Sequence, residues 1–157
     1  MAREADAASR VDTRFAALTS SVAFALHYAW ENVQCGRYFV HATPNPTQFD
    51  MMQATLGDVV MTWIAYAAVA VAAGRWDWPL GRWGRRHWVT LVGAGLAMSI
   101  AVERYALATA RWSYTANNPR IPRFDVSVLP VAQMVLLLPA TFGIGAWLVG
   151  RLRGRSK

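Results

Sequence analysis

The sequence predicts an all-α membrane protein, a bundle of four transmembrane helices with both termini in the cytoplasm. Of its 157 residues, 55% are hydrophobic and only 16% are charged. The apolar residues form runs of roughly 20, the length that a helix needs to cross a bilayer. The cationic residues gather in alternate segments between these runs, and such an asymmetry orients membrane helices.

The composition excludes three other classes of protein. Disordered chains are poor in apolar and aromatic residues, whereas this chain is rich in both. A fold stabilised by disulfides needs paired cysteines, and Cys35 is the only cysteine. The formal net charge of +7 suggests nucleic-acid binding, but such proteins spread their basic residues over a soluble surface. We therefore expect no nucleic-acid partner.

Four runs are long enough to span a membrane, at about residues 14–35, 51–74, 88–112 and 126–150. Only a helix can cross singly, because every backbone N–H and C=O must be paired within the segment. Short connections then favour one four-helix domain over residues 1–157. Residues 1–10 lack the basic start and cleavage site of a signal peptide, so we expect the first span to be retained.

The distribution of Lys and Arg predicts the orientation of the helices in a plasma (inner) membrane. One side carries about eleven of the sixteen cationic residues, namely Arg3, Arg10, Arg14, Arg75, Arg82, Arg85, Arg86, Arg151, Arg153, Arg155 and Lys157. The other side carries about four, namely Arg37, Arg111, Arg120 and Arg123. Cytoplasmic segments are the richer in Lys and Arg, so both termini are predicted to be cytoplasmic.

The connections and two prolines carry weaker signals. The cytoplasmic loop, residues 75–88, holds four Trp, which we interpret as anchors at the level of the lipid headgroups. The two outer loops are rich in proline, and we expect them to be irregular. Pro130 and Pro139 are expected to kink or open the fourth helix beside Gln133.

Two Gly-x-Gly pairs, Gly93 with Gly95 and Gly143 with Gly145, lie inside the third and fourth spans. Small residues let transmembrane helices approach one another closely. We therefore expect helix contacts at these positions.

Three carboxylates, Glu31, Asp58 and Glu103, lie inside the first three spans, and Gln133 lies inside the fourth. A carboxylate in a membrane is costly, and by default it faces the interior of the bundle and has a function. With the predicted topology, all four side chains fall within one to two helical turns of the outer end. This shared depth predicts one polar pocket that opens toward the outer side.

Other polar side chains follow the same helix faces. His27, Glu31 and Gln34 have the spacing i, i+4 and i+7, which places them on one face of a helix. The second span has a similar stripe, Thr55, Asp58, Thr62 and Tyr66. Within a predicted pocket, we expect His27, Gln34 and Gln133 to orient groups by hydrogen bonds.

The pocket has three chemical interpretations. A structural network of interhelical hydrogen bonds is one, although three carboxylates exceed what it needs. Acid–base chemistry is the second, because neighbouring carboxyls in a low-dielectric site can differ in protonation, so that one donates a proton while another stays ionised. For this interpretation Glu31, Asp58 and Glu103 are the candidate catalytic residues. A single metal ion held by His27 and the acids is the third, although the repeated Glu-x-x-His motif of bundle metal sites is absent. A proton relay is a further possibility.

Aromatic side chains near these acids could bind a hydrophobic substrate or stabilise a carbocation. At helical spacing they are Tyr28, Trp30, Trp63, Tyr66, Trp112 and Tyr114. We select Trp30, Tyr66, Trp112 and Tyr114 as substrate-binding candidates beside His27, Gln34 and Gln133.

Four motifs together resemble a group of small, uncharacterised bacterial four-span membrane proteins over most of the chain. They are Ala29-Trp30-Glu31 with Gln34, Gly57-Asp58-Val59-Val60, Glu103-Arg104 with Arg111-Trp112 and Tyr114, and Leu129-Pro130 with Gln133. The resemblance implies a four-helix membrane fold and no particular chemistry.

Two families of isoprenoid cyclases are more distantly similar. Trp30-Glu31 in one span and Asp58 in the next resemble the acid pair of integral-membrane terpene cyclases, which implies an acid–base role for Glu31 and Asp58. Trp112 and Tyr114, followed by Leu129-Pro130, resemble the carotenoid-cyclase pattern. The chain departs from that pattern at residues 131–133, where Val, Ala and Gln stand in place of paired acids.

We therefore expect an integral membrane protein that acts on, or binds, an isoprenoid-like or other lipid-soluble molecule without a cofactor. Its expected partners are membrane lipids, a hydrophobic small-molecule ligand and other proteins in the membrane. The alternatives are a non-catalytic accessory subunit of a larger membrane complex and a metal- or proton-handling membrane protein.

Overall fold

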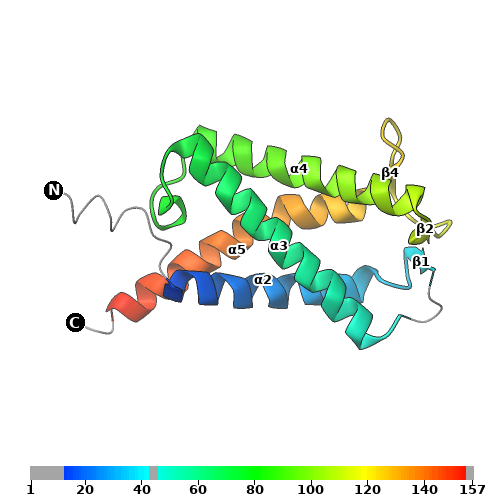
Figure 1. The fold of residues 1–157 in the computed structure, drawn as a ribbon, viewed down its shortest axis with the longest axis horizontal. Helices are drawn as coiled ribbons and strands as arrows, with labels where there is room; N and C mark the ends of the chain where they lie inside the picture. The colour runs from blue at the N-terminus through cyan, green and yellow to red at the C-terminus, as the bar shows by residue number, and fades with distance from the viewer. Residues whose placement is uncertain (1–12, 43–45, 155–157) are drawn as a thin grey trace.

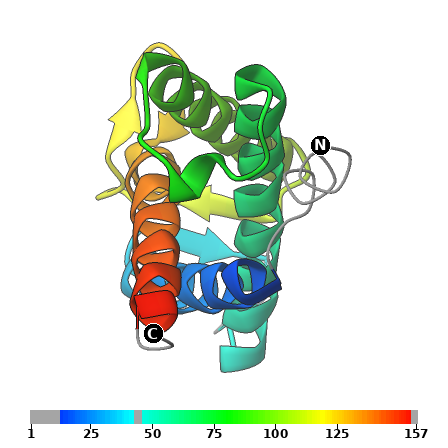
Figure 2. The same cartoon turned by 90° about the vertical axis from the view of Figure 1, so that its left-hand side faces the viewer.

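Four long helices make up most of the computed structural model, which describes residues 13–42 and 46–154 (Figure 1). They are α2 (Thr13–Gln34), α3 (Gln48–Ala73), α4 (Arg85–Ala108) and α5 (Val128–Gly154). Around the bundle α2 packs against α3 and α5, and α4 also packs against α3 and α5 (Figure 2). The prediction of a helical bundle is confirmed by this arrangement.

Three of the four helices, α3, α4 and α5, are long and apolar enough to cross a membrane. Helix α2 is not among them, although it has 22 residues. Its sequence is more polar because it carries His27, Glu31 and Gln34 on its inner face, together with several Ser and Thr. The same residues that form the predicted site thus lower the apolarity of this helix.

The two ends of the bundle differ in structure and charge. At one end α2 begins, α5 ends, and α3 connects to α4 through the short 3-10 helix η1 (Trp78–Leu80) (Figure 1). The other end carries the two loops that were predicted to face outward, called the outer loops below, and the four short strands of the described residues. The described cationic residues of the first end are Arg14, Arg75, Arg82, Arg85, Arg86, Arg151 and Arg153. Arg3, Arg10, Arg155 and Lys157, which were assigned to the same side, lie outside the described residues.

The outer loops are more ordered than the sequence predicted. Strand β1 (Phe39–His41) pairs antiparallel with β2 (Trp112–Tyr114), and β3 (Arg120–Ile121) pairs with β4 (Val126–Ser127). In the first pair, Phe39 lies opposite Tyr114 and His41 lies opposite Trp112. This pairing ties the α2–α3 connection to the α4–α5 connection.

Helix α4 ends at Ala108, whereas the third span was predicted to continue to Trp112. The reason is a reversal of the backbone after Ala108. Ala110 has a positive φ of 52°, and the Arg111 N–H donates to the carbonyl of Ala106 at 2.9 Å. The chain then leaves the helix axis, and Trp112 enters β2.

The prolines of α5 do not open it. The helix is continuous from Val128 to Gly154, with Pro130 in its first turn and Pro139 in its interior. In the first turn a missing N–H costs nothing, because that group has no partner within the helix. The expected opening beside Gln133 was therefore wrong, whereas a kink of the helix at either proline stays a prediction.

Only one glycine of each Gly-x-Gly pair lies at a helix contact. A Cβ on Gly95 would lie 3.1 Å from Leu138 Cδ1, and one on Gly145 would lie 2.4 Å from Thr19 Oγ1. A Cβ on Gly93 or on Gly143 would have no neighbour within 4 Å. A spacing of two residues rotates the helix by about 200°, so that one member of each pair faces outward.

The core near η1 is aromatic. The Trp78 side chain is only 1% exposed, and its indole donates to the carbonyl of Tyr66 at 3.2 Å. Its ring packs against Tyr66, Trp83 and Phe142. Of the four Trp interpreted as interfacial anchors, Trp78 is therefore a core residue instead.

Candidate functional site

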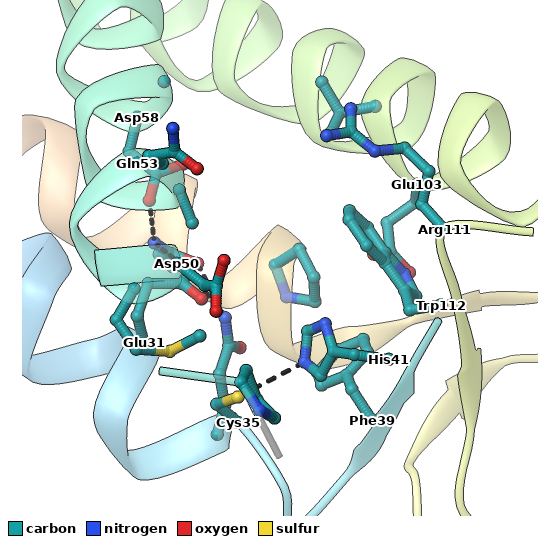
Figure 3. A pocket seen from close by; sticks show the side chains of 18 of the residues that line it. Glu31, Cys35, Phe39, His41, Asp50, Gln53, Asp58, Glu103, Arg111 and Trp112 are labelled. Atoms are coloured by element: carbon teal, nitrogen blue, oxygen red, sulfur yellow. Dashed lines mark hydrogen bonds between the residues drawn. The ribbon is translucent and has the colours of Figure 1, made fainter. Parts of the chain in front are cut away.

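A cavity of about 570 Å³ lies at the strand end of the bundle. Its walls come from the first half of α3 and the second half of α4, and α2 and α5 also contribute side chains (Figure 3). Residues of β1 and β2 line it at the outer end. Its polar lining includes Glu31, Gln34, Cys35, His41, Asp50, Gln53, Asp58, Ser99, Glu103, Arg111, Trp112 and Gln133.

The Gln133 side-chain amide joins the acids of two other helices. Its Nε2 lies 2.9 Å from Asp58 Oδ2 and 3.2 Å from Glu31 Oε1. It also lies 3.0 Å from His27 Nδ1. Since α5 supplies Gln133, α3 supplies Asp58 and α2 supplies the other two, this amide connects three helices. The structure thus brings four of the predicted site residues into one hydrogen-bond network.

The histidine of this network is fully buried and held from both sides. The Thr62 hydroxyl donates to the carbonyl of Asp58 at 2.9 Å and lies 3.3 Å from His27 Nε2. Since a hydroxyl has only one hydrogen, toward His27 it can only accept. While the hydroxyl donates to this carbonyl, the ring proton of His27 lies on Nε2, and Nδ1 is an acceptor for the Gln133 amide.

With this assignment, three acceptors of the network meet the N–H groups of two side-chain amides. The Gln133 amide has two N–H groups, but three acceptors surround its nitrogen: Glu31, Asp58 and His27. Gln34 supplies one more donor, since its Nε2 lies 2.8 Å from Glu31 Oε1. Each of the three acceptors can then have its own N–H. The Glu31 and Asp58 side chains are also in hydrogen-bond contact with one another, and such a bond requires a proton on one of the two carboxyl groups. The geometry is therefore that of an acid pair that shares a proton.

Two predicted residues support the network from outside the cavity. The Trp30 indole donates to Gln34 Oε1 at 3.1 Å, which orients the Gln34 amide so that its nitrogen faces Glu31. His27 lies beneath the acids and does not line the cavity. Neither side chain is placed to contact a molecule bound in the cavity.

Glu103 lines the same cavity but belongs to a second cluster. One of its oxygens, Oε2, accepts hydrogen bonds from the Tyr114 hydroxyl and from the Ser127 N–H, the latter at 3.3 Å. The side chain is fully buried, and Oε1 has no hydrogen-bond partner among the described residues. Burial and the hydrogen bond to Glu103 raise the pKa of Tyr114, so this phenol stays a donor at all ordinary pH values. The predicted third carboxylate thus faces the cavity without contacting the acid pair.

Tyr66 does not belong to the site, which corrects the prediction from the polar stripe of α3. Its side chain is 3% exposed, and its hydroxyl donates to the carbonyl of Trp76. Tyr66 follows Asp58 by two helical turns, so the two share a face but differ in depth by about 12 Å. It packs in the aromatic core near η1 instead.

Three lining residues near the strand end were missed by sequence reasoning, namely His41, Asp50 in the first turn of α3, and Arg111. Cys35 Sγ lies 3.2 Å from His41 Nε2, and both side chains line the cavity (Figure 3). Burial lowers the pKa of His41, and Asp50 opposes this effect. The β1–β2 pairing places His41 and Arg111 at the cavity, and no local pattern of the sequence signals a pairing between such distant segments.

The arrangement of side chains around the cavity does not favour a metal ion. Among residues 13–42 and 46–154, no group of three or more His, Cys, Asp and Glu side chains is arranged to hold one. In the acid cluster, Gln133 Nε2 lies between the carboxyl groups of Glu31 and Asp58, and this nitrogen is a hydrogen-bond donor that cannot bind a metal ion. The chemistry that the residues themselves support is proton transfer and hydrogen bonding at the cavity wall.

Comparison of the chain with known protein families, with curated proteins and with solved structures gave no match. The function must therefore be argued from the site itself.

Proposed function

We propose that this chain is an integral membrane protein that binds a lipid-soluble small molecule in the cavity, and that an acid–base pair there takes up or gives up a proton in the process. Glu31 and Asp58 form the acid–base pair, and Glu103 is a third carboxylate on the opposite wall. Gln133 carries the proposal, because a single amide nitrogen lies within 3.2 Å of both acids while all three side chains line the cavity. His27 and Gln34 hold this network in place.

The membrane topology belongs to the same proposal. We infer four crossings, with α2 as the fourth span and the termini in the cytoplasm of a cell with a plasma (inner) membrane. Charge supports this orientation, because the Arg-rich end of the bundle carries the start of α2, the α3–α4 connection and the end of α5. The cavity then lies near the outer surface. Membrane lipids surround the bundle, and the cavity takes an isoprenoid-like or similar hydrophobic molecule.

The proton of the acid pair is directly measurable. Infrared difference spectra of the purified protein between pH values should show the C=O stretch of a protonated carboxyl that persists at neutral pH. We expect E31Q and D58N each to abolish this band, because each removes one partner of the shared proton. D125N is the matched control, since Asp125 lies in the outer loop with its side chain 78% exposed.

Mass spectrometry of molecules that co-purify with the full-length protein tests the binding half of the proposal. A hydrophobic molecule retained by the wild type and lost from E31Q and D58N supports it. A protein without the infrared band and without a retained molecule contradicts it, and favours the accessory-subunit alternative. Circular dichroism of each variant shows whether the bundle is intact.

A further inference from the structure

The cavity opens sideways, through the surface of the bundle between α3 and α4. Three α3 residues that line it, Gln53, Ala54 and Gly57, are exposed on the outside of the bundle. Across the gap, Val102 of α4 lines the cavity and is 39% exposed. The two helices pack together near η1 and diverge toward the strand end, so the opening lies where they are farthest apart (Figure 1).

The surface around this opening is apolar. Leu56 and Val60 of α3, and Tyr105 of α4, are all more than half exposed. Both α3 and α4 are long and apolar enough to cross a membrane. In a bilayer this surface faces acyl chains, so the opening connects the cavity with the lipid rather than with water alone. A molecule dissolved in the membrane can enter without crossing the outer loops.

Inside the opening, the charged groups are mainly acidic. Glu31 and Asp58 lie on one side, and Glu103 is fully buried with Oε1 unpartnered among the described residues. Asp50 is a fourth acid of the lining, while Arg111 is the single Lys or Arg among the described lining residues and is itself exposed. A carboxylate in such a site is stabilised by a cation that replaces its proton. The charge balance therefore favours a positively charged ligand.

The apolar part of the lining suits a bulky organic ion. Met51, Met61 and Met134 contribute flexible, polarisable side chains that adapt to ligands of different shape. Trp112 and Phe39 add aromatic rings, which attract cations through their faces. The cavity volume of about 570 Å³ lies within the usual range of small-molecule sites.

We propose that the ligand of this cavity is a lipophilic organic cation that enters from the bilayer between α3 and α4. This inference rests on the proposed function and names its substrate class. The cation occupies the space between Glu31, Asp58 and Glu103, and the apolar groups of the ligand lie against the methionines. On binding, the proton shared by Glu31 and Asp58 leaves to the solvent, and the two carboxylates then balance the positive charge. The other titratable or charged groups of the cavity are Cys35, His41, Asp50 and Arg111, with His27 beneath the pair.

Calorimetric titration of the full-length protein in detergent with two ions of equal shape tests this proposal. The probes are tetraphenylphosphonium, a cation, and tetraphenylborate, an anion. We expect the wild type to bind the cation and not the anion. E31Q and D58N should each weaken binding of the cation about tenfold or more, because each removes one charge partner from a low-dielectric site. Proton release on binding, measured in buffers of different ionisation enthalpy, should disappear in both variants.

The opening has its own matched pair of variants. A Cβ on Gly57 would meet no atom within 4 Å, and Gly57 lines the cavity, so G57L places a bulky group at the opening. Gly93 of α4 is equally open and does not line the cavity, which makes G93L the control. In nanodiscs we expect G57L to slow or weaken binding of tetraphenylphosphonium at least about fivefold, and G93L to leave it unchanged.

Each outcome decides between the two proposals. If both ions bind equally, or neither binds, while the infrared band of the shared proton is present, the cation proposal is wrong and the proposed function stands. If the band is absent, the proposed function fails independently of the titrations. If G57L and G93L bind equally well, the ligand does not enter between α3 and α4.

Discussion

The contact between Gly145 of α5 and Thr19 of α2 provides a sharp test of the packing. An alanine at position 145 would place its Cβ 2.4 Å from Thr19 Oγ1, 3.3 Å from Thr19 Cβ and 3.5 Å from Thr19 Cα. Ordinary contacts of a Cβ begin at about 3.4 Å, so α2 and α5 must separate or Thr19 must rotate. Overpacking of this kind costs about 1–3 kcal/mol.

Gly143 offers a control on the same helix with the same substitution. A Cβ at position 143 meets nothing within 4 Å, and Gly inside a helix is less stable than Ala by about 0.5–1 kcal/mol. We therefore expect G143A to stabilise the protein slightly and G145A to destabilise it. Because both substitutions gain the same helix propensity, the two free energies of unfolding should differ by the overpacking cost, about 1–3 kcal/mol.

Unfolding by sodium dodecyl sulfate in mixed micelles, followed by tryptophan fluorescence, measures both free energies, and the chain has eight Trp as probes. Replacement of Thr19 by Ala adds a second check. Thr19 Oγ1 is buried and has no hydrogen-bond partner among the described residues, so T19A removes the clash at little cost. The penalty of G145A should then shrink in the T19A background, as a double-mutant cycle would show. A G145A variant as stable as G143A would refute the close approach of α2 and α5.

The remaining predictions concern the outer loops and the aromatic core. Y114F removes the donor to Glu103 and should lower the free energy of unfolding by about 1–3 kcal/mol, because a buried carboxylate loses a partner; an unchanged value would mean that the bond does not form. W78A should cost about 3–5 kcal/mol, whereas the same change at the half-exposed Trp88 should cost far less, and equal losses would contradict the burial of Trp78. Burial lowers the pKa of His41 in the folded chain. As the pH falls below about 6.5, His41 is therefore protonated in the unfolded chain while it is still neutral in the folded chain. Stability should therefore decrease between pH 7.5 and 5.5, and H41Q should reduce this decrease; a wild type and H41Q with the same pH dependence would contradict it.

Hydrophobic runs were sufficient to predict the helices, because the length and apolarity of a membrane helix are local properties of the chain. The shared depth of Glu31, Asp58 and Gln133 was also readable, since helix length and topology convert sequence position into depth. Tyr66 shows the limit of that reasoning. The helical periodicity predicted the face of Tyr66 correctly. Tyr66 lies two helical turns beyond Asp58, however, and therefore packs in the aromatic core.

The strands could not be predicted, because each has only two or three residues and pairs with a segment far away in the sequence. Without them the sequence gives no reason to place His41 or Arg111 at the cavity. The interfacial position predicted for Trp78 was wrong for a similar reason. Its partners Tyr66 and Phe142 come from two other helices, and composition alone cannot distinguish a tryptophan at the headgroups from one in the core.

The position of Gln133 in the chain has a consequence for how the protein is made. Glu31 and Asp58 belong to the first two helices, and the amide that joins them follows Asp58 by 75 residues. Chains are synthesised from the N-terminus, so both acids are made well before Gln133. Strand β1 likewise has no partner until β2, which follows α4 in the sequence, has been synthesised. Until the last helix is made, the nascent chain holds two carboxyl groups that lack their shared donor. A substitution of Gln133 leaves these early stages unchanged and takes effect only when the last helix packs against the first two, where the amide that joins them is then missing.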